Sequence, residues 1–439
     1  LLAREKAAWE ESSKAIATAS SVAAPTEAPA AAAPVAEAPP EEKEKEKSSD
    51  EAYIETARCA SCNECINVND KMFAYDGNKQ AYIKDLNEPV ILHVVTQKGK
   101  GYQPALDNPT KFHGLGSYCV RDGETQAAPT PTFSHIFGST LVEMAREDES
   151  ITAITAAMAS GTKLDLFKEA FPKRYFDVGI AEEHGALFAC GLAAEGMKPY
   201  IAIYSTFMQR CIDMIQHDAA LQKLPVRFCM DRAGLSPDDG PTHHGLFDIA
   251  MIRSIPNIVF MQPKDEAEFV HMLRTMNHYQ NGPTVIRYPR GCGAGTPVPA
   301  KAEILPIGKA EVLQTGQDVT LVSLGTMIGI ARETAALLEA QGHTVTLINA
   351  RFIKPLDDEC IRRHAASSRV VCTFEDHSIS GGFNSAVLES LETGDVKTPV
   401  EAIAWPDQFI EHGSESILRK KYGLTAEAAL QKIIPHLNS

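Results

Sequence analysis

The 439-residue sequence lacks any uninterrupted apolar run of the roughly 18 residues that a membrane-spanning helix needs. Its first residues lack the basic-then-apolar pattern of a signal peptide, and they lack an initiator methionine, as a fragment or a partial gene model would. An excess of basic residues is also absent. The net charge is −15, which disfavours nucleic acid and anionic membrane surfaces as partners. We therefore expect a cytoplasmic protein that binds neither nucleic acid nor membrane.

The cysteines lack the arrangement of a disulfide framework. Most of the ten stand singly in apolar surroundings, which is typical of buried reduced thiols. The exception is a C-x2-C-x2-C run formed by Cys59, Cys62 and Cys65, a spacing typical of iron–sulfur ligands. A [4Fe–4S] cluster needs four ligands, and the Cys-Pro pair that supplies the fourth in two-cluster ferredoxins occurs nowhere in the sequence. A [4Fe–4S] cluster and a zinc site completed by another residue both stay open as metal sites.

Composition divides the chain into five parts. Residues 1–50 are rich in Ala, Pro and Glu and predict a disordered linker, because so few large apolar side chains cannot offset the ordering entropy. Residues 51–86 hold the cysteine run and a hairpin pattern, and residues 87–130 hold a strand and a Gly/Lys loop. In residues 131–295 and again in 296–439, short apolar strands alternate with helices. This pattern predicts an α/β fold with two doubly wound domains after a largely disordered N-terminal region.

Ligands of open α/β sheets bind beyond the carboxyl ends of the strands, so polar residues at strand ends are candidates for a site. Glu182, Glu183 and His184 stand at a predicted strand-to-helix junction. They are candidates for chemistry, but acidic residues there are also favoured by the helix dipole alone.

A second group, Tyr204, Phe207 and Arg210, follows the next predicted strand. An aromatic ring and a cation in this position could hold a flat, anionic ligand. The alternative is a core phenylalanine beside an arginine paired at the surface.

A long polar loop from Asp231 to Asp248 contains Asp239, His243 and His244. Conspicuous loops of this kind often carry function, and histidine can transfer protons near neutral pH. A metal site on the two histidines is disfavoured, because adjacent side chains diverge.

Arginines form the last group. Arg287 and Arg290 stand at a strand end, and Arg232 could join them at the same edge. Guanidinium groups suit phosphate, although pairing with the chain's own carboxylates is the alternative.

Together these segments resemble the 1-deoxy-D-xylulose-5-phosphate synthase family of thiamine-diphosphate enzymes, from about Pro89 to the C-terminus. "GPTH" is shared with transketolases and with the β subunits of 2-oxoacid dehydrogenases. "THHGLFD" after "DRAG", with "YSTFMQR" upstream and "RYPRG" and "RFIKPLD" downstream, is typical of the synthases. The resemblance implies a transketolase-like pyrimidine-binding domain followed by a transketolase C-terminal domain. It also implies a homodimer.

The family is a transferase that joins pyruvate to glyceraldehyde 3-phosphate with loss of carbon dioxide, for isoprenoid, thiamine and pyridoxal precursor synthesis. It uses thiamine diphosphate and Mg²⁺. The resemblance implies that Glu182 hydrogen-bonds the cofactor's aminopyrimidine, that Phe207 stacks on this ring, and that His243 transfers protons with help from Asp239. It implies a catalytic His113 and a cofactor-binding Lys98 from the edge of the family's first domain. The residues that it places around the substrate phosphate are Tyr204, Arg210, Arg232 and Arg290.

The sequence departs from the family in one large respect. The family's diphosphate-binding domain carries a Gly-Asp-Gly motif for Mg²⁺, and no such motif occurs here. Only the tail of that domain is present, so residues 87–130 are interpreted as a remnant and linker. Half of the cofactor site is then missing, and we expect the chain to be inactive alone or to work with a separate chain that carries the diphosphate-binding domain.

Two alternatives remain open. In the first alternative, the chain is half of a split transketolase or a 2-oxoacid dehydrogenase β-like chain. In the other alternative it is an iron–sulfur electron-transfer fusion, because the cysteine segment as far as about Asp85 is similar to the front of a bacterial ferredoxin-type domain.

Overall fold

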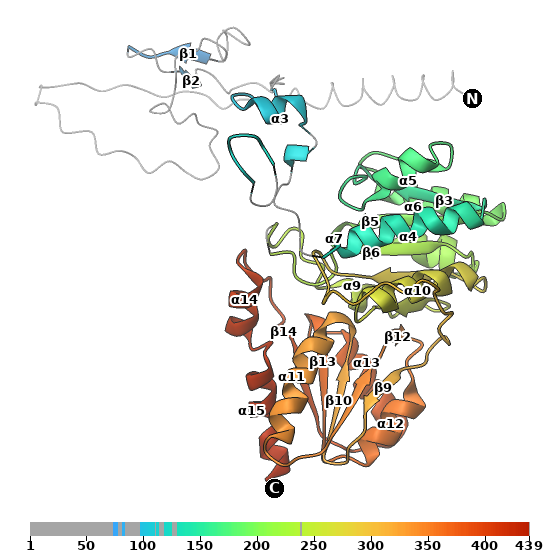
Figure 1. Ribbon diagram of the computed structural model, residues 1–439, viewed down its shortest axis with the longest axis vertical. Coiled ribbons are helices and arrows are strands. Elements are labelled where there is room, and N and C mark those ends of the chain that lie inside the picture. The colour runs from blue at the N-terminus through green and yellow to red at the C-terminus, as the bar shows by residue number, and fades with distance from the viewer. Residues whose placement is uncertain are drawn as a thin grey trace, which may run out of the picture. The chain divides into compact units, whose positions relative to one another are not determined.

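The structure is a computed structural model (Figure 1), and it falls into two units that are described separately. The first unit comprises residues 1–116 and 120–123, and the second comprises residues 117–119 and 124–439. The cysteine run lies outside the described residues, so its metal site stays a prediction. The structure describes residues 73–77, 81–83, 97–109, 111–113, 118–124, 130–237 and 239–438.

The described part of the first unit is small. Strands β1 (Phe73–Tyr75) and β2 (Ala81–Ile83) pair antiparallel, with Phe73 opposite Ile83. This pairing confirms the predicted hairpin. Farther along lie the short helix α3 (Gln103–Asp107) and a 3-10 turn, η2 (Lys111–His113).

The first part of the second unit is a seven-stranded sheet in the order β12-β7-β8-β6-β5-β3-β4. Its strands are parallel except β12, which runs antiparallel to β7. The central strands are buried along their whole length, as expected for a parallel sheet covered on both faces. The strands are β3 (Ile151–Thr155), β4 (Tyr175–Asp177), β5 (Lys198–Tyr204), β6 (Arg227–Asp231), β7 (Val259–Met261), β8 (Thr284–Arg287) and β12 (Phe352–Lys354).

Helices cover both faces of this sheet (Figure 1). Helices α4 (Phe133–Glu147), α5 (Leu164–Ala170) and α10 (Glu266–His278) share one apolar cluster, and Thr132 and Asp265 cap the first and last of these helices. Helices α6 (Glu182–Ala194) and α9 (Asp248–Ile252) belong to the cluster on the other face.

The helix expected after β5 is not one regular helix. It passes through several helical geometries, and only its last part is a π-helix, with wider turns than an α-helix. Its parts are α7 (Ser205–Met208), η3 (Gln209–Cys211), α8 (Ile212–Met214) and η4 (Ile215–Ala220).

The C-terminal part is a five-stranded sheet in the order β14-β13-β10-β11-β9, with β9 antiparallel and the rest parallel. Helices α11, α14 and α15 pack on one face, and α12 and α13 pack on the other. The prediction of two α/β domains is confirmed. The elements are β9 (Glu311–Gln314), β10 (Val319–Ser323), η5 (Gly325–Met327), α11 (Ile328–Glu339), β11 (Val345–Asn349), α12 (Asp358–Ala366), β13 (Val370–Ser378), α13 (Phe383–Thr393), β14 (Val400–Trp405), α14 (Glu415–Tyr422) and α15 (Ala426–Leu437).

The two domains are joined by more than a linker. Strand β12 belongs to the C-terminal half of the chain but pairs with the first sheet, which the sequence did not lead us to expect. Beside it, the buried carboxylate of Glu268 accepts hydrogen bonds from Asn349 Nδ2 at 2.9 Å and from Arg351 Nε at 2.7 Å. Lys264 Nζ lies 3.2 Å from the same carboxylate. A buried polar network therefore fixes one domain to the other.

None of the helices in the described ranges combines the length and the apolar character needed to cross a bilayer.

We expect Glu268→Ala to lower the free energy of unfolding by about 1–3 kcal/mol, because it removes the buried carboxylate that binds Asn349, Arg351 and Lys264. The loss stays within this range because Glu311 still pairs with both cations. Denaturant titration of the purified chain measures this loss. Glu392→Ala is the matched control, since Glu392 is 78% exposed and pairs with Lys397 at the surface, and we expect a change within about 0.5 kcal/mol. Equal losses in the two variants would contradict the interdomain role of Glu268.

Candidate active site

The Glu182 carboxylate stands at the first turn of α6, directly after the turn that follows β4. Its side chain is 3% exposed, whereas the neighbouring Glu183 and His184 are exposed. The N-cap residue of this helix, Ala181, makes no side-chain capping hydrogen bond. Oε1 of Glu182 accepts a hydrogen bond from Arg210 Nη1 at 2.9 Å. Of the three candidates at this junction, only Glu182 therefore has a buried, paired carboxylate.

Phe207 and His243 meet although they are far apart in the sequence. Their ring centroids lie 5.3 Å apart in an edge-to-face arrangement. Phe207 follows β5, and His243 belongs to the long loop after β6, so two neighbouring strand ends bring them together. The contact is reinforced by Thr206, whose hydroxyl donates to the Thr242 carbonyl at 3.2 Å. This geometry places an imidazole in contact with an aromatic ring.

A cluster of opposite charges lies at the ends of β6 and β8. Asp239 Oδ2 lies 2.6 Å from Arg232 Nη1 and 3.2 Å from Arg290 Nη1. The Arg232 guanidinium is also 4.0 Å from the centre of the Tyr204 ring. Burial raises the pKa of Tyr204, so its hydroxyl stays neutral at physiological pH. Two cations thus share one carboxylate, and the group keeps a net positive charge that suits an anion.

Arg287 does not join this cluster. Its side chain is completely buried, and its Nε donates to Asp248 Oδ2 at 2.9 Å. We considered it as a phosphate ligand, and the structure instead shows pairing with the chain's own carboxylate, the alternative that the sequence left open. The reason is position: Arg287 is still within β8, whereas Arg290 lies beyond its end.

The two adjacent histidines also differ. His243 is half-buried, whereas His244 is buried and its Nδ1 accepts a hydrogen bond from the Ser236 backbone N–H at 3.0 Å. Burial lowers the pKa of His244, so it is neutral and stabilises the loop. His243 is therefore the better placed of the two for proton transfer.

Sequence reasoning missed one titratable group. Asp231 is fully buried at the end of β6, and burial raises its pKa to about 7. It directly precedes Arg232, whose backbone has a positive φ of 58°. Its place at a strand end was the available signal.

Two further predicted site residues, Lys98 and His113, lie in the described part of the first unit. There, Lys98 Nζ is 2.6 Å from His113 Nδ1, so the structure brings these two together. In the part of the chain that the structure describes, no three or more His, Cys, Asp or Glu side chains are placed to hold a metal ion.

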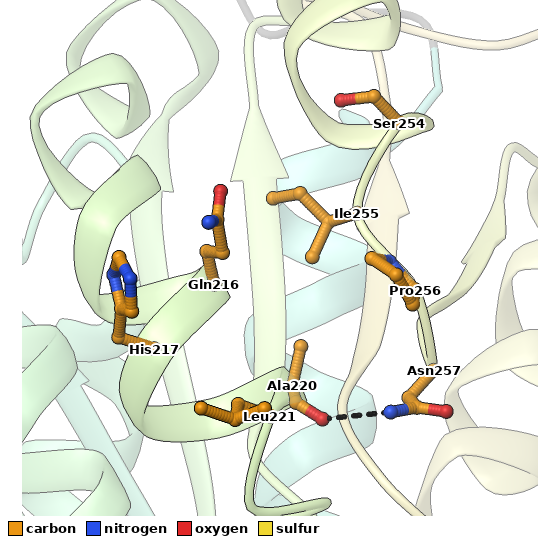
Figure 2. A pocket seen from close by; sticks show the side chains of 8 residues that line it. All are labelled: Gln216, His217, Ala220, Leu221, Ser254, Ile255, Pro256 and Asn257. Carbon is orange, nitrogen blue, oxygen red and sulfur yellow. Dashed lines mark hydrogen bonds between the residues drawn. The ribbon is translucent and has the colours of Figure 1, made fainter.

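A pocket of about 430 Å³ lies elsewhere in the second unit (Figure 2). Its walls come from the end of η4 and from the segment before β7, so it lies at the edge of the sheet opposite to the candidate site. Asn257 Nδ2 donates to the Ala220 carbonyl at 3.1 Å across its floor. None of the predicted site residues is among those that line it, which are Gln216, His217, Ala220, Leu221, Ser254, Ile255, Pro256 and Asn257.

Comparisons with known proteins agree with this fold. Residues 130–294 match the pyrimidine-binding domain of transketolase, and residues 308–428 match the transketolase C-terminal domain. A solved structure described as a split gene transketolase, inactive beta4 tetramer, is 31% identical with a TM-score of 0.63. The match covers 70% of this chain and 99% of that one. The chain belongs to the transketolase family.

Within this family, the chain is similar to 1-deoxy-D-xylulose-5-phosphate synthases. It is 52% identical to the synthase of Methylacidiphilum infernorum over 361 residues and 51% identical to that of Acidobacterium capsulatum over 357 residues. These matches cover 82% and 81% of this chain, respectively, but only 57% of each relative. The chain therefore spans little more than half the length of the curated relatives that it matches.

We expect Asp239→Asn to strengthen the binding of inorganic phosphate, because the substitution removes the carboxylate charge that competes for Arg232 and Arg290. The expected gain is about fivefold to tenfold in Kd, equivalent to about 1 kcal/mol, measured by ³¹P NMR titration. Asp213→Asn is the control, since Asp213 is exposed and pairs with His217 at the surface, away from Arg232 and Arg290. Weaker phosphate binding in Asp239→Asn would contradict an anion site at this cluster.

Proposed function

We propose that this chain is the pyrimidine-binding and C-terminal part of a 1-deoxy-D-xylulose-5-phosphate synthase. The proposed reaction is the condensation of pyruvate with glyceraldehyde 3-phosphate, with loss of carbon dioxide. The observation that carries the proposal is the buried Glu182 carboxylate near a half-buried Phe207, with Arg210 contacting both side chains. The identity of about 50% to synthases supports this choice of reaction. We place the two domains at residues 131–295 and 296–439.

The described residues fit the aminopyrimidine half of thiamine diphosphate. A buried carboxylate such as Glu182 can accept a hydrogen bond from a ring nitrogen, and Phe207 offers an aromatic face for stacking. When bound, the cofactor supplies a nucleophilic carbon and an electron sink. In this proposal Glu182 holds the proton on the pyrimidine ring, and Lys98 of the first unit assists in cofactor binding.

The chain's other residues act on the substrates. His243 moves a proton to or from the substrate oxygen, because its half-buried imidazole lies against Phe207. Asp239 assists the proton transfer by His243, and His113 of the first unit is a further catalytic residue. The residues proposed to hold the phosphate of the aldehyde are Tyr204, Arg210, Arg232 and Arg290.

We also propose that a separate chain supplies the diphosphate and Mg²⁺ sites. The supporting observation is the match to nearly the whole of a chain described as a split gene transketolase. That chain is described as an inactive beta4 tetramer. On this proposal our chain is inactive alone and becomes active when the missing domain is added.

A second candidate function follows from the same structure. Because the split transketolase matches over 99% of its length, transfer of a ketol group between sugars is the alternative. Supplying pyruvate with glyceraldehyde 3-phosphate in one assay, and a ketose phosphate with an aldose phosphate in another, separates the two reactions.

The experiment mixes the chain with the N-terminal remainder of the Methylacidiphilum infernorum synthase, thiamine diphosphate and Mg²⁺. We expect carbon dioxide release from pyruvate that requires glyceraldehyde 3-phosphate. Glu182→Gln should lower this rate by about 10²–10⁴-fold, because the amide cannot hold the pyrimidine proton. Glu183→Gln is the matched control. The Glu183 carboxylate is next to Glu182 in the sequence but is exposed, so this variant should retain the rate. Equal rates for the two variants would refute the role of Glu182.

We further propose that the chain forms a homodimer through the face that carries α6. Ile180 is 81% exposed and Leu187 is 50% exposed on this face, beside the buried Glu182. Two such apolar side chains favour burial against a second copy.

Sedimentation at micromolar concentration should show a dimer, and Ile180→Asp with Leu187→Asp should shift it to a monomer. Leu388→Asp, at another exposed leucine in α13, is the control and should leave the dimer intact. A monomeric parent chain would overturn this assignment.

A further inference from the structure

Arg287 is the centre of a buried hydrogen-bond network directly behind the candidate site. Its guanidinium donates to Asp248 Oδ2 at 2.9 Å and to Gln262 Oε1 at 2.5 Å. Its Nη2 also donates to the backbone carbonyls of Gly245 and Asp376, each at 3.2 Å. The side chain has no solvent exposure, so all of these bonds form in a dry environment, where they are strong and costly to lose.

The partners of Arg287 belong to different parts of the site. Gly245 lies two residues after His243, in the loop proposed to transfer protons. Asp248 Oδ2 also accepts the hydroxyl of Ser205, which begins the segment that carries Phe207. Asp376 belongs to β13 of the C-terminal domain. One guanidinium therefore connects the His243 loop, the Phe207 segment and the second domain.

The surrounding contacts show how closely these parts fit. Gly234 and Gly245 exchange two backbone hydrogen bonds of 2.8 Å and close the base of the loop. A Cβ on Gly234 would lie 2.1 Å from Asp376 Oδ2, and a Cβ on Gly245 would lie 2.5 Å from Ser205 Oγ. The loop base is thus packed directly against both neighbouring parts.

The charge of the network is balanced locally. His377 Nε2 lies 4.0 Å from Asp248 Oδ1, but burial lowers the pKa of His377 to about 4, so this imidazole is neutral at physiological pH. Arg287 then supplies the positive charge that Asp248 faces. The planar guanidinium also reaches acceptors in several directions at once, which a lysine ammonium on a flexible stem does not reproduce.

We propose that Arg287 is a positioning residue that holds the His243 loop against the Phe207 segment and the C-terminal domain. The inference rests on the proposed function only for the roles of His243 and Phe207. The geometry itself is measurable without cofactor, substrate or partner chain.

The test is NMR of the full chain with ¹³C-labelled histidine rings. The signal of His243 is assigned as the one that disappears in His243→Gln. In the parent chain, the His243 ring lies in edge-to-face contact with Phe207 at 5.3 Å between centroids, so the ring current displaces its signal from that of an unstructured histidine. Arg287→Lys should remove most of this displacement.

Arg227→Lys is the matched control. Arg227 is equally buried in the same sheet, but it donates to the backbone carbonyls of Met276, Pro225 and Tyr279, on the far side from the loop. Both variants lose a buried guanidinium, so a general loss of stability affects both. Only the loss of positioning moves the His243 signal in Arg287→Lys and leaves it unchanged in Arg227→Lys.

An unchanged His243 signal in folded Arg287→Lys overturns the proposal, as does an equal change in both variants. If Arg287→Lys does not fold, Ser205→Ala replaces it, because this change cuts the connection at its other end. Ser205→Ala should displace the same signal, and an unchanged signal would again overturn the proposal. Lack of activity in the assembled enzyme, with the His243 signal behaving as expected, would count against the proposed reaction and not against the positioning role.

Discussion

The candidate site depends on the parallel pairing of β5, β6 and β8. In this register Tyr204 lies opposite Asp231, and Met230 lies opposite Arg287, so the three strands end at one edge. Segments that are far apart in the sequence therefore continue into the same region of space. Without this register, Phe207 and His243 would not meet, and Arg232 and Arg290 would not share Asp239.

Burial then decides what each charged residue does. Arg287 and Arg290 are three residues apart, but the first is enclosed within the sheet and the second is 24% exposed beyond its end. An enclosed guanidinium must be fully hydrogen-bonded, which makes it a structural centre. A partly exposed one can exchange a carboxylate for a ligand. The same distinction separates His244 from His243 and Glu182 from Glu183.

The C-terminal domain contributes to the site, although the proposed site residues of the second unit all come from the first of its two domains. Its strand β12 extends the first sheet, and Asp376 contacts the base of the His243 loop through Leu235 and Arg287. A continuous apolar cluster also spans both domains. The C-terminal domain thus acts as a rigid support for the loop, which gives a physical reason for the two domains to occur together.

The sequence by itself determined the fold class, because the alternation of short apolar strands with helices leaves few arrangements other than parallel sheets covered by helices. It also indicated which strand ends are candidates for chemistry, since the residues there are polar and the motifs are local. The crossing of β12, the broken helix after β5 and the choice between Arg287 and Arg290 came only from the tertiary structure. These features depend on burial and on pairing between distant segments, and neither has a local signature in the chain. The position of Asp231 at a strand end can be read from the sequence, but the burial that raises its pKa comes only from the folded sheet.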